Sequence, residues 1–149
     1  MTIFAGKKDA LMKIINKIVL AVIGLSLSFF MLSCQKERVE PPVINFKTGA
    51  LFLHANDTLP GDSVFTIGIE ASKQGTNGEL RIFNISKSVN DSALVTVYSK
   101  GLTGTNRDSY SYDFTTKADT IPGTKCKYLF TVTNLNDITK SISLTIVTE

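Results

Sequence analysis

The sequence has no tryptophan, one histidine and two cysteines among its 149 residues. Transition-metal sites usually combine several His or Cys ligands at short spacing, and no such cluster occurs in the sequence. The one histidine, His54, is accompanied by no nucleophile-elbow pattern, so it has no evident Ser or Cys nucleophile to activate. We therefore expect a non-enzymatic protein without metal or cofactor. A hydrolase with an unrecognised site is the remote alternative.

Long apolar runs are also scarce, and the single one spans residues 18–32. It is shorter than the ~20 residues that a membrane-spanning helix needs. Lys13 and Lys17 provide a basic flank before it. This pattern is typical of a cleaved secretory signal, with an uncleaved transmembrane anchor as the alternative.

The apolar run leads into residues 31–33 (Met-Leu-Ser), directly before Cys34. This stretch resembles the lipobox of bacterial lipoproteins, in which the cysteine is acylated. The resemblance implies that residues 1–33 form a lipoprotein signal peptide, with a signal helix and a functional start at Met12. It also implies a lipid anchor on Cys34, with palmitate as the expected acyl group. Ordinary secretion is the alternative.

Residues 34–42 are charged, lack periodicity and end in a Pro-Pro pair, which predicts an extended, lipidated tether. The stretch after the cysteine reaches at most about 25–30 Å. The residue after the cysteine is Gln35. An aspartate at this position would resemble an inner-membrane retention signal, and the sequence does not have one there. The Lys36-Glu37 pair, together with Glu40, resembles the charged export signal of Bacteroidetes surface lipoproteins. The resemblance implies delivery to the outer membrane, and it leaves the periplasmic and the surface face open.

The expected mature chain, residues 34–149, has no excess of positive or negative charge. The signal contains four lysines and one aspartate, so residues 34–149 carry 12 basic and 12 acidic side chains. Nucleic-acid phosphates demand a basic patch, which a neutral domain lacks. We expect no nucleic-acid partner. The expected partners are the membrane, through the lipid anchor, and a glycan or protein ligand.

The second cysteine, Cys126, has no partner for a disulfide if lipidation uses Cys34. It alternates with Tyr128, Phe130 and Val132 along the sequence. This pattern predicts a buried cysteine that packs as a small apolar side chain, and no neighbouring residue indicates a reactive thiol.

From residue 43 onward, short β-branched and aromatic runs alternate with turn residues, without helical periodicity. Residues 54–62 are a predicted loop because they contain Asn-Asp and Pro-Gly pairs. The apolar positions in residues 79–87 break strict alternation, which a β-bulge would explain. We expect one all-β domain, residues 43–149, with seven strands at 43–47, 63–72, 79–87, 93–99, 109–116, 125–133 and 140–148.

Alternation within these strands also predicts the core between two sheets. The residues expected to be buried are Phe65, Ile67, Phe130, Val132, Leu144 and Ile146. Tyr110, Tyr112 and Phe114 share one face of a strand whose other face is polar. That polar face favours core aromatics over a sugar-stacking platform.

The final third of the chain carries a family resemblance. Three segments are similar to the last two strands of immunoglobulin-like and polycystic-kidney-disease-like (PKD-like) domains. They are residues 122–124 (Pro-Gly-Thr), residues 130–134 (Phe-Thr-Val-Thr-Asn) and the terminal Ser-Leu-Thr-Ile-Val. The resemblance implies a seven-stranded, antiparallel immunoglobulin-like β-sandwich. PKD-like domains carry an aspartate-rich motif that includes tryptophan. This chain lacks that motif because it has no tryptophan.

Five of the seven aspartates after residue 33 directly precede Ser or Thr, and four of these pairs are followed by an aliphatic residue. The pattern resembles the Asp-Ser/Thr-aliphatic O-glycosylation motif of Bacteroidetes exported proteins. The resemblance implies sugars on Thr58, Ser63, Ser92 and Thr120. One alternative is that these pairs close turns before strands. Another is a weak cation or ligand site formed by Asp57, Asp62, Asp91 and Asp119.

In an immunoglobulin-like sandwich, successive loops lie at opposite ends. The four complete motifs are therefore expected together, at the end away from the tether. The resulting hypothesis is a lipid-anchored outer-membrane or cell-surface protein that acts as a binding or structural display module. The alternative is an accessory subunit of a larger surface assembly.

Overall fold

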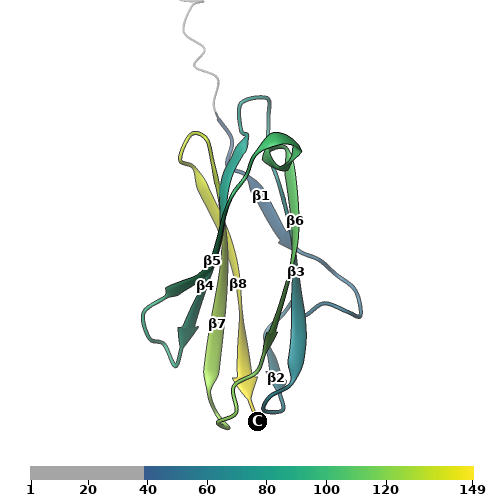
Figure 1. Cartoon of the computed structure of the whole chain (residues 1–149), viewed down its shortest axis with the longest axis vertical. Coiled ribbons are helices and arrows are strands. Elements are labelled where there is room, and N and C mark those ends of the chain that lie inside the picture. The colour runs from purple at the N-terminus through teal and green to yellow at the C-terminus, as the bar shows by residue number, and fades with distance from the viewer. Residues whose placement is uncertain (1–38) are drawn as a thin grey trace, which may run out of the picture. The chain divides into compact units, whose positions relative to one another are not determined.

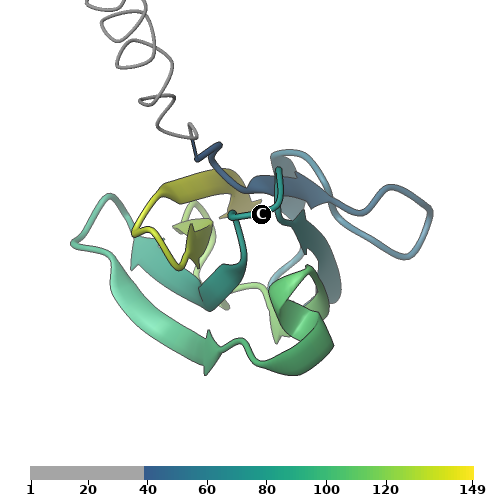
Figure 2. The same ribbon diagram turned by 90° about the horizontal axis from the view of Figure 1, so that it is seen from above.

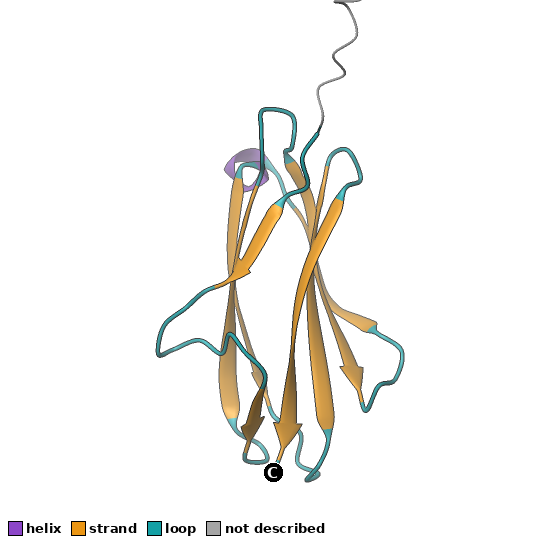
Figure 3. Cartoon of the chain, turned by 180° about the vertical axis from the view of Figure 1, so that it is seen from behind, coloured by secondary structure: helices purple, strands orange, loops and turns teal. Residues whose placement is uncertain are grey.

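A computed structural model describes residues 39–149 of the chain. The predicted signal peptide, Cys34 and the first part of the tether lie outside the described residues. Within them, the fold is all-β, with two facing sheets and one short 3-10 helix, η1 (Gly104–Arg107) (Figures 1 and 3). No helix in this part of the chain has the length and apolar character needed to cross a membrane.

The described residues form eight strands. Their bounds are β1 Val43–Phe46, β2 Asp57–Leu59, β3 Val64–Ser72, β4 Leu80–Val89, β5 Val95–Gly101, β6 Ser109–Lys117, β7 Lys125–Asn134 and β8 Thr139–Thr148. One sheet has the order β1-β3-β6, and the other has the order β2-β8-β7-β4-β5. Seven of the eight correspond to the predicted strands, with ends that differ by about two residues.

The additional strand, β2, is the main departure from the expected fold. It lies within residues 54–62, which the sequence predicts as a loop, and it pairs in parallel with the end of β8. The five-stranded sheet is therefore mixed, whereas the sequence predicted a fully antiparallel fold. Pairing is favoured here because Asn56 Oδ1 accepts a 2.8 Å hydrogen bond from Thr145 N, which fixes the chain beside β8.

One of two interruptions in register confirms the bulge expected in the third predicted strand. The pairing of β4 with β7 shifts between Leu80 and Ile82, and its pairing with β5 shifts between Ile85 and Ser86. The second shift adds Val97 to β5, whereas the first adds Arg81 to β4, so the alternation of inward and outward side chains in β4 changes phase at Arg81. This is why the apolar residues of β4 do not follow a strict period of two.

The core lies between the two sheets, and all six residues predicted for it are buried there. Cys126 is buried in the same cluster, as predicted. The Phe130 ring lies edge-on to Phe46 and Phe114, at centroid distances of 5.9 and 6.2 Å, and so connects the two sheets. Burial of apolar surface of this kind is the main stabilising contribution to a small domain.

The predicted row of aromatics on β6 belongs to the core. Tyr110 is buried, and Tyr112 and Phe114 are half-buried against it. The Tyr112 ring stacks on Tyr98 of β5 at 4.6 Å, and the hydroxyls of Tyr98 and Tyr110 lie 3.4 Å apart. These rings close the side of the sandwich between β5 and β6, so their faces pack against protein and do not form an open platform.

Most loops of the domain lie at its two ends (Figure 1), while the β1–β2 segment and the β4–β5 turn project from its sides (Figures 1 and 2). The chain enters β1 at the end that also holds the β3–β4 loop, η1 and the β7–β8 loop (Figure 1). We call this the tether-side end. A hydrogen bond from Asn134 Nδ2 to Glu40 O, at 3.5 Å, connects the incoming chain to the end of β7. The C-terminus, β2 and the β6–β7 loop lie at the far end (Figure 3).

Candidate functional site

The predicted glycosylation residues lie in the half of the domain away from the tether-side end. Thr58 is in β2, Ser63 directly precedes β3, and Thr120 is in the β6–β7 loop. Backbone hydrogen bonds connect these segments: Glu149 N donates to Leu59 O at 3.0 Å, and Asp62 N donates to Asp119 O at 3.3 Å. Three segments bearing a motif therefore meet at the far end.

The fourth residue, Ser92, belongs to the β4–β5 turn, which projects from the side of the same half (Figure 1). The Asn90 side chain accepts a 2.9 Å hydrogen bond from Lys125 N, and Asn90 N donates to Lys125 O at 2.8 Å. These bonds attach the turn to the start of β7. Thr58, Ser92 and Thr120 are exposed, and Ser63 is half-buried.

The aspartates of these motifs have local structural roles. Asp57 Oδ1 accepts a 2.8 Å bond from Thr58 N, and Asp119 Oδ1 accepts a 3.1 Å bond from Ile121 N. Asp62 forms a 3.1 Å ion pair with Lys117. Asp91 has φ 59° and follows Asn90 at φ 48°, as a tight hairpin turn requires. The turn-closing interpretation has geometric support at Asp91 and Asp119, whereas Asp57 lies in β2 and closes no turn.

No three His, Cys, Asp or Glu side chains in residues 39–149 are arranged to hold a metal ion. Asp57 is in β2 and the other three motif aspartates lie in three different loops, so within residues 39–149 they provide no shared cation site. His54 is exposed, and its Nδ1 lies 3.2 Å from Phe52 O within its own loop. Glycosylation of the neighbouring Ser and Thr residues stays a prediction.

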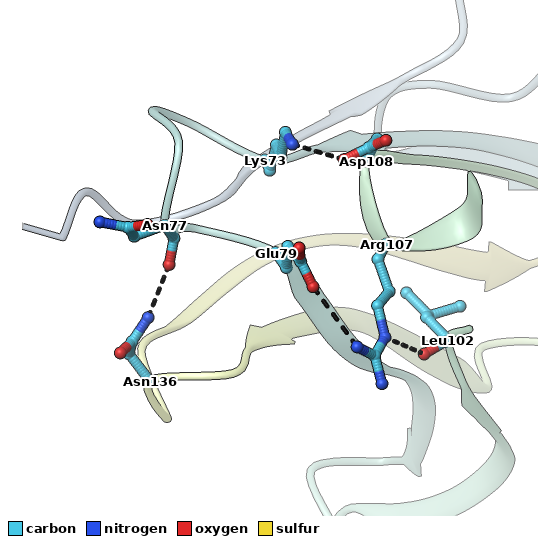
Figure 4. A network of polar contacts seen from close by, with 7 residues as sticks. All are labelled: Lys73, Asn77, Glu79, Leu102, Arg107, Asp108 and Asn136. Atoms are coloured by element: carbon cyan, nitrogen blue, oxygen red, sulfur yellow. Dashed lines mark hydrogen bonds and ion pairs between the residues drawn. The ribbon is translucent and has the colours of Figure 1, made fainter. Parts of the chain in front are cut away.

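The tether-side end is held by a network of polar contacts that sequence reasoning did not find (Figure 4). Arg107 of η1 donates to Leu102 O at 3.4 Å and forms a 3.4 Å ion pair with Glu79. Asp108 pairs with Lys73. Asn136 Nδ2 donates to Asn77 O at 2.8 Å, which connects the β7–β8 loop to the β3–β4 loop. The loops at this end are therefore attached to one another.

Beside this network lies an open groove of about 560 Å³ on the outer surface of the three-stranded sheet. Strand register builds its floor, because Asn45 of β1, Glu70 of β3 and Ser111 of β6 are aligned across the sheet. The next aligned row is Val43, Ser72 and Ser109. Thr105 and Asn106 of η1 also line the groove.

The floor side chains point away from the core because their strand neighbours point into it. Ile44, Ala71 and Tyr110, one on each strand, are buried between the sheets. Side chains alternate between the faces of a strand, so the residues on either side of these three face outward. The sequence gives no local signal for this groove, since its Asn and Ser residues match the polar face of any strand.

No protein-family model matches the sequence, and no curated protein matches it. Among solved structures, Spo0M, a sporulation control protein from Bacillus subtilis, is similar with 12% sequence identity and a TM-score of 0.46. The match covers 75% of this chain and 50% of the Spo0M chain, so this chain matches half the length of that protein.

Proposed function

We propose that the protein is a lipid-anchored outer-membrane or cell-surface protein whose single domain acts as a binding or structural display module. One observation carries the proposal: residues 39–42, the last part of the predicted tether, lead into the domain at one end, while β2, the β6–β7 loop and the C-terminus lie at the other (Figure 1). A protein held at a membrane through its N-terminus would present the far end outward. The lipobox-like residues before Cys34 supply the expected anchor.

The strand order supports an immunoglobulin-like assignment of the domain. If β2 is left out, the seven remaining strands can be numbered in chain order. The first, second and fifth (β1, β3, β6) then form one sheet, and the third, fourth, sixth and seventh (β4, β5, β7, β8) form the other. Immunoglobulin sandwiches divide their first, second and fifth strands from their third, sixth and seventh in the same way. The parallel pairing of β2 with β8 is the feature that departs from the predicted seven-stranded form.

Replacement of the acylated cysteine tests the anchor. In Cys34→Ala, the acyl acceptor is lost, so an unprocessed precursor should accumulate. The wild type should partition with outer membranes and require detergent for extraction, because more than one acyl chain holds a protein stably in a bilayer. Ser33→Ala is the matched control, since it keeps a small residue before the cysteine. Mature, membrane-bound Cys34→Ala protein would contradict the proposal.

O-glycosylation of the far-end loops is a separate part of this proposal. Its support is the exposure of Thr58, Ser92 and Thr120 in the half of the domain that would face outward. Peptide mass spectrometry on protein from the native host should find sugars at these three residues and at the half-buried Ser63. Ser109 is the internal control, because Asp108-Ser109 is followed by Tyr110 and not by an aliphatic residue. Unmodified peptides at all four positions would exclude the modification.

One observation favours the accessory-subunit alternative. Strand β5 is the edge of its sheet, and its Val95 and Val97 side chains are 64% and 49% exposed. An exposed apolar edge strand can pair with another chain. A photo-reactive residue at position 97, placed in intact native cells, should then crosslink to one defined protein, and the same residue at Ser143 should not. Equal labelling at the two positions would exclude a specific assembly at β5.

A further inference from the structure

The groove on the three-stranded sheet combines many polar groups with few internal contacts. Apart from Tyr110, whose side chain is buried in the core, seven of its lining residues have polar side chains: Asn45, Glu70, Ser72, Thr105, Asn106, Ser109 and Ser111. Within residues 39–149, none of these side chains is hydrogen-bonded or ion-paired to another protein group. When the groove is empty, their donors and acceptors bind only water. They are therefore available to a ligand that displaces this water.

The charge of the groove restricts the ligand class. Glu70 is its one charged lining residue, and no Lys or Arg lines it. The nearby cations are already paired, since Lys47 forms a 2.6 Å ion pair with Asp113 and Lys73 pairs with Asp108. A phosphate, sulfate or carboxylate would therefore meet a negative charge without a compensating cation. The groove disfavours anions.

The remaining chemistry matches a polyhydroxylated ligand. Two Asn amides each offer donors and an acceptor, four hydroxyls can do both, and the Glu70 carboxylate accepts only. Vicinal hydroxyls of a sugar present the same mixture of donors and acceptors. The volume of about 560 Å³ lies in the range of small-ligand sites, so a short oligosaccharide fits.

The groove is also fixed in shape before any ligand arrives. Its floor is a hydrogen-bonded sheet, and its η1 wall is held by the contacts of Arg107 with Leu102 O and Glu79 (Figure 4). Asp108, at the end of η1, pairs with Lys73 and accepts a 2.9 Å backbone bond from Lys73 N through its own carbonyl. A site on a rigid framework loses less entropy when it binds.

We infer that this groove binds a neutral oligosaccharide, through the aligned Asn45, Glu70 and Ser111 side chains and the η1 residues Thr105 and Asn106. The inference rests on the proposed function, because it names the ligand class of the binding module. The Tyr110 ring beneath the floor is buried and offers no stacking face. Binding through hydrogen bonds alone should be weak, with a dissociation constant on the order of 1 mM.

The test uses the full chain in detergent and immobilised oligosaccharides of glucose, galactose, mannose and N-acetylglucosamine. A heparin oligosaccharide and an oligolysine peptide are the contrasting probes. The wild type should bind at least one neutral oligosaccharide, with less binding to either charged probe. Ser111→Trp, which fills the groove from its floor, should weaken binding by at least about tenfold. Ser143→Trp, on the outer face of the other sheet, is the matched control and should bind as the wild type does.

A second pair of variants tests the carboxylate. Glu70→Gln should weaken binding, because an amide cannot replace both acceptor oxygens, and Glu149→Gln, a charge-matched change at the C-terminus, should have no effect. The inference is overturned if no neutral oligosaccharide binds, if a charged probe binds best, or if Ser111→Trp binds like the wild type. Such a result would leave the Cys34→Ala test of the anchor unaffected, so the two proposals can fail separately.

Discussion

Lys47 forms a 2.6 Å ion pair with Asp113, and the two residues lie on opposite sides of strand β3, in the sheet that bears the groove. Between them is Gly68, which is buried beneath the Lys47 stem and the Phe52 ring. A Cβ atom at Gly68 would lie 2.7 Å from Lys47 Cδ and 2.8 Å from Phe52 Cδ1. The close approach therefore requires glycine at this position.

Gly68→Ala should destabilise the domain by about 1–3 kcal/mol, because Lys47 and Phe52 must move to admit the methyl group. Chemical denaturation of the full chain measures the change. Gly101→Ala is the matched control, since no atom lies within 4 Å of a Cβ there. Equal stability of Gly68→Ala and the wild type would show that the packing over β3 is not tight.

Phe130→Ala should cost about 3–5 kcal/mol of unfolding free energy, since the ring is fully buried and contacts two aromatic rings of the opposite sheet. That is a large part of the margin of a small domain. Denaturant titration, followed by far-ultraviolet circular dichroism, measures the loss. A change below about 1 kcal/mol would contradict the assigned core.

Tyr128→Phe should be neutral or stabilising. The Tyr128 hydroxyl is buried and has no hydrogen-bond partner among residues 39–149, and the Lys87 Nζ atom lies 5.6 Å from the ring centroid. A buried hydroxyl without a partner keeps its desolvation penalty, so its removal relieves that penalty. Thermal unfolding of the two proteins decides the sign. A loss of about 1 kcal/mol or more would indicate that the hydroxyl is bonded in solution.

Alkaline pH should destabilise the domain through the tyrosines between β5 and β6. Burial raises the pKa of Tyr110, and the hydrogen bond with Tyr98 raises it further; burial also raises the pKa of Tyr112. In the unfolded chain these phenols lose protons near pH 10, whereas the folded domain retains them. The free energy of unfolding should therefore fall as the pH rises above about 10.

Denaturation at several pH values between about 8 and about 11 measures this dependence. Tyr110→Phe removes one of the retained protons, so its stability should fall less steeply with pH. Identical slopes for the wild type and Tyr110→Phe would show that Tyr110 is not protected from ionisation in the folded state.

The strands with strong alternation were predictable from sequence, and β2 was not. Phe65, Ile67, Leu144 and Ile146 alternate with polar residues, so local pattern alone identifies their strands. Strand β2 has three residues between Asn56 and Pro60, and it exists because β8, almost ninety residues later in the chain, lies beside it. Pairing over such a separation has no local signature.

Of the two candidate sites, one could be recognised from the sequence and the other could not. The Asp-Ser/Thr pairs are contiguous in sequence, so their pattern could be recognised, and their turn geometry follows from the residue types. The groove brings together Asn45, Glu70 and Ser111 from three separate strands. Only the sheet register aligns them, and register is fixed by long-range pairing that single-sequence patterns do not specify.

The central claim is that the protein is anchored through acylated Cys34, and the intact mass of protein purified from its native host tests it most directly. The expected mass is that of residues 34–149 plus the acyl groups on the N-terminal cysteine, with further increments for any sugars. Mild enzymatic or chemical removal of sugars before the measurement separates the two contributions. A mass that includes residues 12–33, or a chain that begins at Cys34 without acyl groups, would contradict the account.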